Sequence, residues 1–289
     1  PGPYTAKAGL MESVDFLCEA LPPGTRYSLR IIRKDNGNDL VKNLFFTDFG
    51  GMADSATHYS SEGWNVYYAT AGFGAGSKAD ADNAVAKREL YIDVDCGPTK
   101  PYATKADGLA ALKEFVQTMG LPRPTLVDSG NGIHAHWFFS EAVPVHDWHG
   151  VASSLKKHCL DHEFKVDGAC TADIVRVLRV PGTINTKGGQ EVRLLTPVKH
   201  HAFEKLRDIL GAEPSDIFKA VRERNRAAGK PGESEVAKLV ASGKTEVPHR
   251  EYGLGEKGRY KGLPKRFVAG AVVLGDTDKC GEGAEVTLE

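Results

Sequence analysis

Two aspartates one residue apart are the strongest chemical signal in this sequence. Asp93 and Asp95 lie in the run Tyr-Ile-Asp-Val-Asp-Cys over residues 91–96. Alternate residues of a strand project from one face, so these carboxylates would point the same way while Ile92 and Val94 pack behind them. Carboxylates held together on a rigid element are the ligands that a pair of Mg²⁺ or Mn²⁺ ions needs for in-line phosphoryl chemistry. The alternative is a strand that runs into an acidic turn.

A glycine-rich turn followed by two histidines is the second candidate site. Residues 128–137 read Asp-Ser-Gly-Asn-Gly-Ile-His-Ala-His-Trp. Ser129 and Asn131 belong to a tight turn whose backbone N–H groups can converge on an anion. His134 and His136 would then share one face of the strand that follows. A single histidine on a strand is usually structural. Two on one face after such a turn fit a functional site as well as they fit a structural role.

The third candidate site combines a carboxylate at the end of a strand with a basic segment further along the chain. Residues 164–167 read Phe-Lys-Val-Asp, which places Asp167 at the end of a short apolar run that resembles a strand. Asp173 is a second candidate for the same role, but it precedes an apolar segment and could cap a helix, where an acidic residue suits the helix dipole. We therefore favour Asp167.

Basic residues follow in the run Arg-Val-Leu-Arg-Val-Pro-Gly-Thr-Ile-Asn-Thr-Lys over residues 176–187. We expect a helix near residues 172–178, on which Arg176 and Arg179 would share a face and could clamp phosphates. Asn185 and Lys187 come after the Pro-Gly turn. The alternative is a basic edge that is simply solvated.

The elements that must position these residues alternate between strands and helices. Apolar residues at helical spacing predict a helix that Thr104 caps and that Gly120 and Pro122 end. The Gly-rich residues 72–77 are expected to be a loop. Strands interleaved with helices, with few βαβ repeats, indicate an α+β fold with a mixed sheet. The other predicted strands are 27–32, 43–49, 64–70, 90–94, 125–127, 133–139, 164–166 and 191–196, and the other predicted helices are 148–159, 203–210 and 215–226.

Composition sets the outer limits. The 289 residues carry 37 Lys+Arg against 38 Asp+Glu, and this balance excludes a uniformly basic coat protein. The five scattered cysteines favour free thiols in a reducing compartment. No apolar run approaches the length of a membrane span. We divide the chain into a domain over 1–200, a helical accessory region over 201–230 and a flexible basic extension or linker over 231–289.

The order of these motifs, over about Trp64 to Leu195, resembles the archaeo-eukaryotic primase superfamily. It is most similar to the primase-polymerase domains of phages, plasmids and other mobile elements. The resemblance implies a mixed or antiparallel β-sheet core of the primase type, similar to an RNA-recognition motif, flanked by helices and followed by a small helical region. The sequence departs from the family at Gly132, where a serine is frequent.

The resemblance also implies roles for individual residues. Asp93, Asp95 and Asp167 would bind two catalytic Mg²⁺ or Mn²⁺ ions. His134, helped by Ser129 and Asn131, would contact the phosphates of the incoming nucleotide. The downstream basic block would face the triphosphate through Arg176, Arg179, Asn185 and Lys187.

The implied activity is template-dependent nucleotidyl transfer by a DNA primase, a DNA polymerase or both, during replication of a phage or other mobile element. The expected partners are a single-stranded or primed DNA template, NTPs or dNTPs, and a replicative helicase in the same parent protein or in trans. We expect no membrane partner and a cytoplasmic location in a host cell.

Other functions fit parts of the sequence. The His134-Ala135-His136 run also suits a rolling-circle nuclease that cleaves single-stranded DNA with a tyrosine, for which Tyr252 and Tyr260 are candidates. A zinc site from His158, Cys159, His162 and Cys170 lacks the usual Cys-x-x-Cys spacing. A silent module that only binds single-stranded DNA is the third alternative, and the carboxylates at all three motif positions argue against it.

Overall fold

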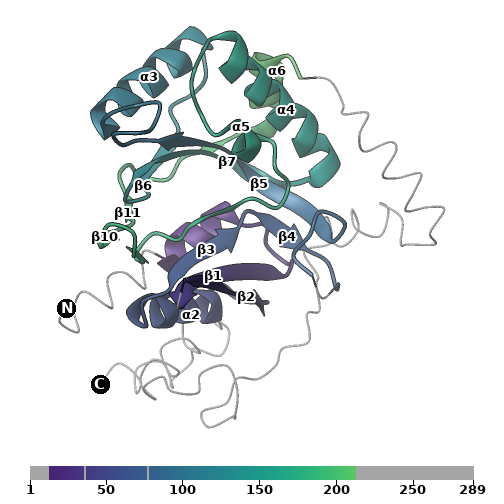
Figure 1. Ribbon diagram of the computed structural model, residues 1–289. Coiled ribbons are helices and arrows are strands. Elements are labelled where there is room, and N and C mark those ends of the chain that lie inside the picture. The colour runs from purple at the N-terminus through teal and green to yellow at the C-terminus, as the bar shows by residue number, and fades with distance from the viewer. Residues whose placement is uncertain (1–12, 36, 77, 213–289) are drawn as a thin grey trace, which may run out of the picture.

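A computed structural model describes residues 13–212 of the chain, except residues 36 and 77 (Figure 1). The described part is built on two β-sheets with helices packed against them. The expected α+β fold is confirmed. The predicted helix at 215–226 and the predicted extension at 231–289 lie outside the described residues.

The larger sheet carries most of the predicted site. It is six-stranded in the order β11-β6-β7-β5-β4, with β12 added to β7, and its pairings are antiparallel except for β12 with β7. The long central strands β5 and β7 pair over most of their length, which sets Asp93 opposite His134. Its strands are β4 (Ala71–Phe73), β5 (Ala84–Asp95), β6 (Thr125–Asp128), β7 (Gly132–Pro144), β11 (Arg193–Leu194) and β12 (His200–His201).

Three helices lie together on one side of this sheet (Figure 1). They are α3 (Lys105–Thr118), α4 (Val145–Asp161) and α6 (Phe203–Leu210). The predicted start of α3 is confirmed, because Thr104 and Asp107 form a reciprocal capping box. Gly120, with a φ of 65°, ends that helix as expected.

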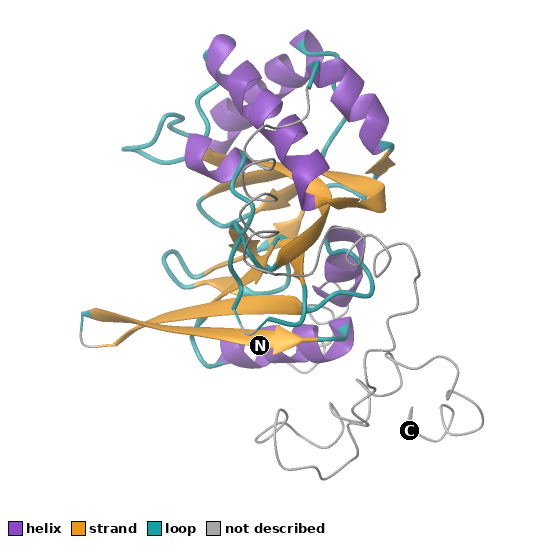
Figure 2. Ribbon diagram, turned by 90° about the vertical axis from the view of Figure 1, so that its right-hand side faces the viewer, coloured by secondary structure: helices purple, strands orange, loops and turns teal. Residues whose placement is uncertain are grey.

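The smaller sheet lies on the other side. Its order is β2-β1-β3-β8, all antiparallel, and β1 and β2 form a long hairpin whose outer half projects from the body (Figure 2). Helix α2 packs against this sheet and buries Met52, Ala53 and Ala56. The elements are β1 (Tyr27–Asp35), β2 (Asn38–Phe46), α2 (Phe49–Ser61), β3 (Asn65–Ala69) and β8 (Val177–Arg179).

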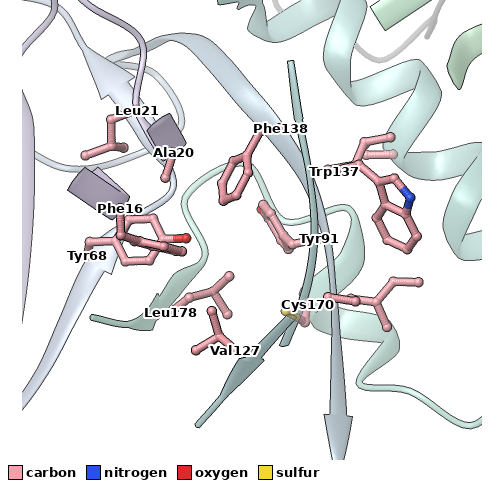
Figure 3. Close-up of a cluster of buried hydrophobic side chains, with 14 of the residues drawn as sticks. Phe16, Ala20, Leu21, Tyr68, Tyr91, Val127, Trp137, Phe138, Cys170 and Leu178 are labelled. Atoms are coloured by element: carbon pink, nitrogen blue, oxygen red, sulfur yellow. The ribbon is translucent and has the colours of Figure 1, made fainter. Parts of the chain in front are cut away.

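The main core joins the two sheets. Figure 3 shows Tyr68 and Leu178 of the smaller sheet with Tyr91, Val127 and Phe138 of the larger one, in a single buried cluster. A helical segment over residues 13–20 adds Phe16, whose ring lies 5.5 Å from that of Tyr68 and 5.7 Å from that of Phe138. The shared core therefore fixes the strands β5 and β7, which carry Asp93 and His134.

Several local predictions are wrong. The expected helix near 172–178 does not form. The single helical turn α5 (Gly168–Thr171) ends before it, and residues 177–179 form β8 because they pair with β3. Residues 164–166 belong to no strand; the neighbouring N–H of Asp167 instead bonds the carbonyl of Asp93. The predicted strand over 43–49 ends at Phe46, and Asp48 caps α2.

Two further differences concern short strands. Gly72, assigned to a loop, lies in β4, where a β-carbon would come within 2.3 Å of the Thr25 hydroxyl oxygen. The strand expected over 191–196 is split between β11 and a small ribbon of β9 (Ile184–Asn185) and β10 (Gln190–Glu191).

Candidate active site

Asp93 and Asp95 lie at the end of β5, on the face opposite Ile92 and Val94, which are fully buried. The Asp93 side chain is 17% exposed, and its pKa is raised to about 7 by burial and then by the negative charge of Asp95. Asp95 is more open and forms a 2.7 Å ion pair with Lys100. A cation bound beside Asp93 would therefore favour the ionised form of this carboxylate.

Asp167 is bound directly to this strand end. Its backbone N–H donates a 3.1 Å hydrogen bond to the carbonyl oxygen of Asp93. Its Oδ1 accepts from the N–H groups of Ala169 and Cys170 and so caps α5, while Oδ2 faces Arg176. Asp173, by contrast, uses Oδ1 to accept from the N–H of Val175 in its own turn.

Arg176 bridges two of the carboxylates. Its Nη2 lies 2.6 Å from Asp167 Oδ2 and 3.8 Å from Asp93 Oδ2. The Arg176 Nε is buried and has no hydrogen-bond partner among the residues that the structure describes. A buried donor without a partner is uncommon in folded proteins, so this nitrogen would gain from a ligand or water oxygen that reached it.

The histidines of β7 differ in their surroundings. His134 is 4% exposed, with Nε2 3.8 Å from Asp93 Oδ1, and its pKa is lowered well below the usual value by burial and then by His136 and the arginines. Its Nδ1 is buried without a partner in the described part of the chain. His136 is fully buried and its Nδ1 lies 2.6 Å from Glu89 Oε2, so it belongs to the core.

The glycine-rich turn between β6 and β7 is braced from several sides. The N–H of Ser129 donates to the Gly132 carbonyl, and that of Gly130 donates to Asp128 Oδ1. Lys105 holds Asp128 in a 2.6 Å ion pair. Two of the turn's N–H groups are thus already bonded within the protein, which leaves fewer of them for an anion.

Asn185 is one of these braces. Its side chain is 1% exposed, donates from Nδ2 to the Ser129 carbonyl at 2.8 Å and accepts at Oδ1 from the N–H of Lys187. The structure therefore places Asn185 behind the turn. The exposed Asn131 has its Oδ1 beside Gly188, in the loop that carries Lys187.

Arg179 lies on the neighbouring strand β8. Its Nη1 donates to Asn65 Oδ1 at 2.8 Å, and its guanidinium carbon lies 4.7 Å from the centre of the Tyr67 ring. Asn65 and Tyr67 did not stand out in the sequence. Their two-residue spacing on a strand next to the basic block is the signal that could have found them.

The donor set suits a divalent cation of the Mg²⁺ type. Three carboxylates supply hard oxygen ligands, and burial, followed by the charge of Asp95, raises the pKa of Asp93, so a cation beside it would favour its ionised form. Within the described residues no three such side chains stand arranged as metal ligands, and Arg176 is the group that now compensates Asp93 and Asp167.

The alternative zinc site, which the sequence disfavoured for its spacing, gains no support from the surroundings of its residues. Cys159 is buried on α4, and His158 Nε2 lies 3.1 Å from the carbonyl oxygen of Leu210. No zinc-type cluster is found in the described ranges. No helix of the described chain is long and apolar enough to cross a membrane.

No protein-family model matches the chain, and no curated protein matches it. Among solved structures, the AEP domain of the cyanophage S-2L primase-polymerase matches with a TM-score of 0.52 at 16% identity, over 71% of this chain and 97% of that domain. This likeness shows the fold.

Two more distant structures are the catalytic domain of primase RepB' in complex with initiator DNA and the polymerase domain of Mycobacterium tuberculosis ligase D in complex with DNA. The first has a TM-score of 0.46 at 13% identity and covers 75% of this chain and 97% of its own. The second has a TM-score of 0.34 at 14% identity and covers 82% and 92%. At these scores neither adds to the assignment of the fold.

Proposed function

We propose that this chain, which has the fold of the AEP domain of a primase-polymerase, is a nucleotidyltransferase that makes or extends a strand on a DNA template. One observation carries the proposal. Asp93 and Asp95 on β5 and Asp167 before α5 come together at one strand end, with Arg176 across two of them. Clustered carboxylates beside a cation are what phosphoryl transfer from a nucleotide requires.

The carboxylates would hold the cofactor. Asp93, Asp95 and Asp167 offer oxygen atoms to Mg²⁺ or Mn²⁺, and Asp93 has the most to gain because its ionised form is both buried and repelled. Two such ions, when bound, stabilise the attacking and the leaving oxygen of an in-line displacement.

The basic groups would hold the nucleotide. The guanidinium of Arg176 can exchange a carboxylate partner for a phosphate oxygen, and its free Nε gives it a second donor. The neutral imidazole of His134 can donate one hydrogen bond to a phosphate. The Lys187 ammonium has no ion-pair partner in the described ranges, and its backbone N–H donates to the Oδ1 of Asn185, which braces the turn. Positioning and charge compensation by such groups supply most of the catalysis in phosphoryl transfer.

A single strand of DNA would lie along the face of the smaller sheet that carries Arg30, Tyr67 and Arg179, which are partly exposed. Arg30 of β1 pairs in register with Tyr67 of β3, and Tyr67 pairs with Arg179 of β8, so three side chains form one row. Tyrosine can stack on a base and the arginines can meet phosphates. The further partners we propose are NTPs or dNTPs and a replicative helicase, in the cytoplasm of the host of a phage or other mobile element.

Primer extension and unprimed synthesis on single-stranded DNA, with Mg²⁺ or Mn²⁺ and each nucleotide set, test the proposal. We expect synthesis by the wild type and a loss of at least about 100-fold in Asp93→Asn and Asp95→Asn. Asp208→Asn is the matched control, since that side chain is 74% exposed on α6 and should leave the rate unchanged. Full activity in both site variants would overturn the assignment.

The nuclease and the silent module predict different results. A nuclease would cleave single-stranded DNA and stay linked to it through a tyrosine, in a manner abolished by Tyr252→Phe or Tyr260→Phe. The burial of His136 against Glu89 disfavours this function, because both histidines would have to face one metal. A silent module would bind DNA without synthesis by the wild type.

A further inference from the structure

Lys87 is a fully buried lysine on β5, the strand that also carries Asp93 and Asp95. Its exposed fraction is 0%, and it lies on β5 upstream of Asp93. Its Nζ is 4.3 Å from the centre of the Trp148 ring. No carboxylate pairs with it among the residues that the structure describes. A charge buried without a counter-ion is costly, so an apolar residue would serve packing better.

The contacts of Lys87 are two hydroxyl groups. Its Nζ donates to Thr70 Oγ1 at 2.5 Å and to the Tyr91 hydroxyl at 3.1 Å. Burial lowers its pKa from 10.5 to about 7. Both the ammonium and the neutral amine carry the two N–H bonds that these contacts need, so the arrangement holds in either protonation state.

Each of the two hydroxyls donates a hydrogen bond to the backbone segment that carries Arg176. The Tyr91 hydroxyl donates to the carbonyl of Asp173 at 2.5 Å, and Thr70 Oγ1 donates to the carbonyl of Arg176 at 3.0 Å. The N–H of Thr70 adds a 2.9 Å bond to that same Arg176 carbonyl.

The direction of these bonds depends on Lys87. Thr70 Oγ1 also lies 3.2 Å from the Tyr91 oxygen, so without the lysine one hydroxyl could donate to the other. The Asp173 or the Arg176 carbonyl would then keep only its backbone N–H donor and lose the side-chain bond. Because Lys87 donates to both oxygens, it favours the state in which both hydrogens face the backbone of residues 173–176.

We propose that Lys87 is a positioning residue for Arg176, which fixes the backbone of residues 173–176 through Thr70 and Tyr91 so that the guanidinium meets Asp93 and Asp167. The role of Arg176 in the reaction rests on the proposed function, whereas the positioning itself does not. The two parts are therefore tested separately.

Hydrogen–deuterium exchange tests the positioning. In Lys87→Met we expect the amides of Thr70, Val175 and Arg176 to exchange at least about tenfold faster than in the wild type. Tyr68→Phe is the matched control: it removes a buried hydroxyl that bonds Glu89 in the same core and should leave these amides unchanged. Tyr91→Phe keeps the lysine but removes the bond to Asp173 and should behave like Lys87→Met, whether or not Lys87→Met folds. Wild-type exchange at these amides in Tyr91→Phe, or in folded Lys87→Met, would overturn the proposal.

A double-mutant cycle tests the consequence for activity. We expect Lys87→Met to raise the KM for the nucleotide and to lower kcat/KM about tenfold, and to add less than about twofold in an Arg176→Ala background. Independent, multiplying effects would show that Lys87 does not act through Arg176. If the wild type makes no product at all, the proposed function fails while the exchange experiment still decides the positioning.

Discussion

The backbone N–H of Asp167 donates to the backbone carbonyl of Asp93 across 3.1 Å, which joins two aspartates from distant parts of the sequence. Arg176 then reaches both side chains, at 2.6 and 3.8 Å. A guanidinium in this place compensates charge that a divalent cation would otherwise neutralise. Arg176 and a bound cation therefore compete for the same two carboxylates.

Mn²⁺ should stabilise the folded protein through the carboxylates. A ligand that binds only the native state at about 100 times its Kd adds roughly 2.7 kcal/mol to the free energy of unfolding. We expect Mn²⁺ to raise the Tm of the wild type and to have little effect on Asp93→Asn or Asp95→Asn, as measured by differential scanning calorimetry. Asp208→Asn should respond like the wild type, and an equal rise in all four proteins would contradict the site.

Without metal, Asp93→Asn should be more stable than the wild type. Burial and the charge of Asp95 raise the pKa of Asp93 from 3.8 to about 7, so its ionised form destabilises the fold increasingly as pH rises between these values. Each unit corresponds to about 1.4 kcal/mol. Asparagine has the same shape without the charge, and Arg176 keeps Asp167. We expect a gain of about 1–3 kcal/mol at pH 8 in EDTA by urea unfolding. A variant less stable than the wild type would mean that the carboxylates are not in conflict.

Lys87 should make stability depend on pH in the opposite sense. Its pKa is lowered to about 7 in the fold and is 10.5 when exposed, so between these values the unfolded chain binds the extra proton and stability rises with pH. Lys87→Met should lack this slope, which is at most about 1.4 kcal/mol per pH unit. Urea unfolding of both proteins at pH 7, 8 and 9 measures the difference. Parallel pH profiles would rule out a buried lysine of lowered pKa.

The sequence predicted those parts of the fold whose patterns are local. The alternation in β5 and β7 and the cap at Thr104 each belong to one short segment, and each prediction is confirmed. Helix α2 was missed because Phe-Gly-Gly-Met-Ala-Asp-Ser has weak helix propensity. It is held by burying small residues against the smaller sheet. Residues 177–179 form a strand only because β3 offers a partner far away in the sequence.

The candidate site likewise has features that one short segment determines and features that depend on contacts between distant segments. The two-residue spacing of Asp93 and Asp95 specifies a shared face of a strand without further information. The position of Arg176 between carboxylates, and that of Asn185 behind the turn, depend on bonds between distant segments. Such bonds leave no periodic trace in the sequence, so Asn185 could be expected to face a triphosphate when its side chain in fact braces Ser129.

The brace at the turn can be tested with a pair of glycines. Gly130 has a φ of 92°, and a β-carbon there would lie 2.8 Å from Asn185 Nδ2; Gly189 has a φ of 66° with nothing within 4 Å of that position. Alanine at either position strains the backbone by about 1–2 kcal/mol. Only Gly130→Ala also displaces Asn185 from the Ser129 carbonyl, and a buried group left unbonded costs about 1–3 kcal/mol more. We therefore expect Gly130→Ala to destabilise the protein more than Gly189→Ala by urea unfolding. The excess should shrink in an Asn185→Ala background, because that variant has already lost the bond to Ser129. Part of the clash stays, since the β-carbon of residue 185 lies 2.9 Å from the added β-carbon. Equal losses in the two glycine variants would show that Asn185 does not support the turn.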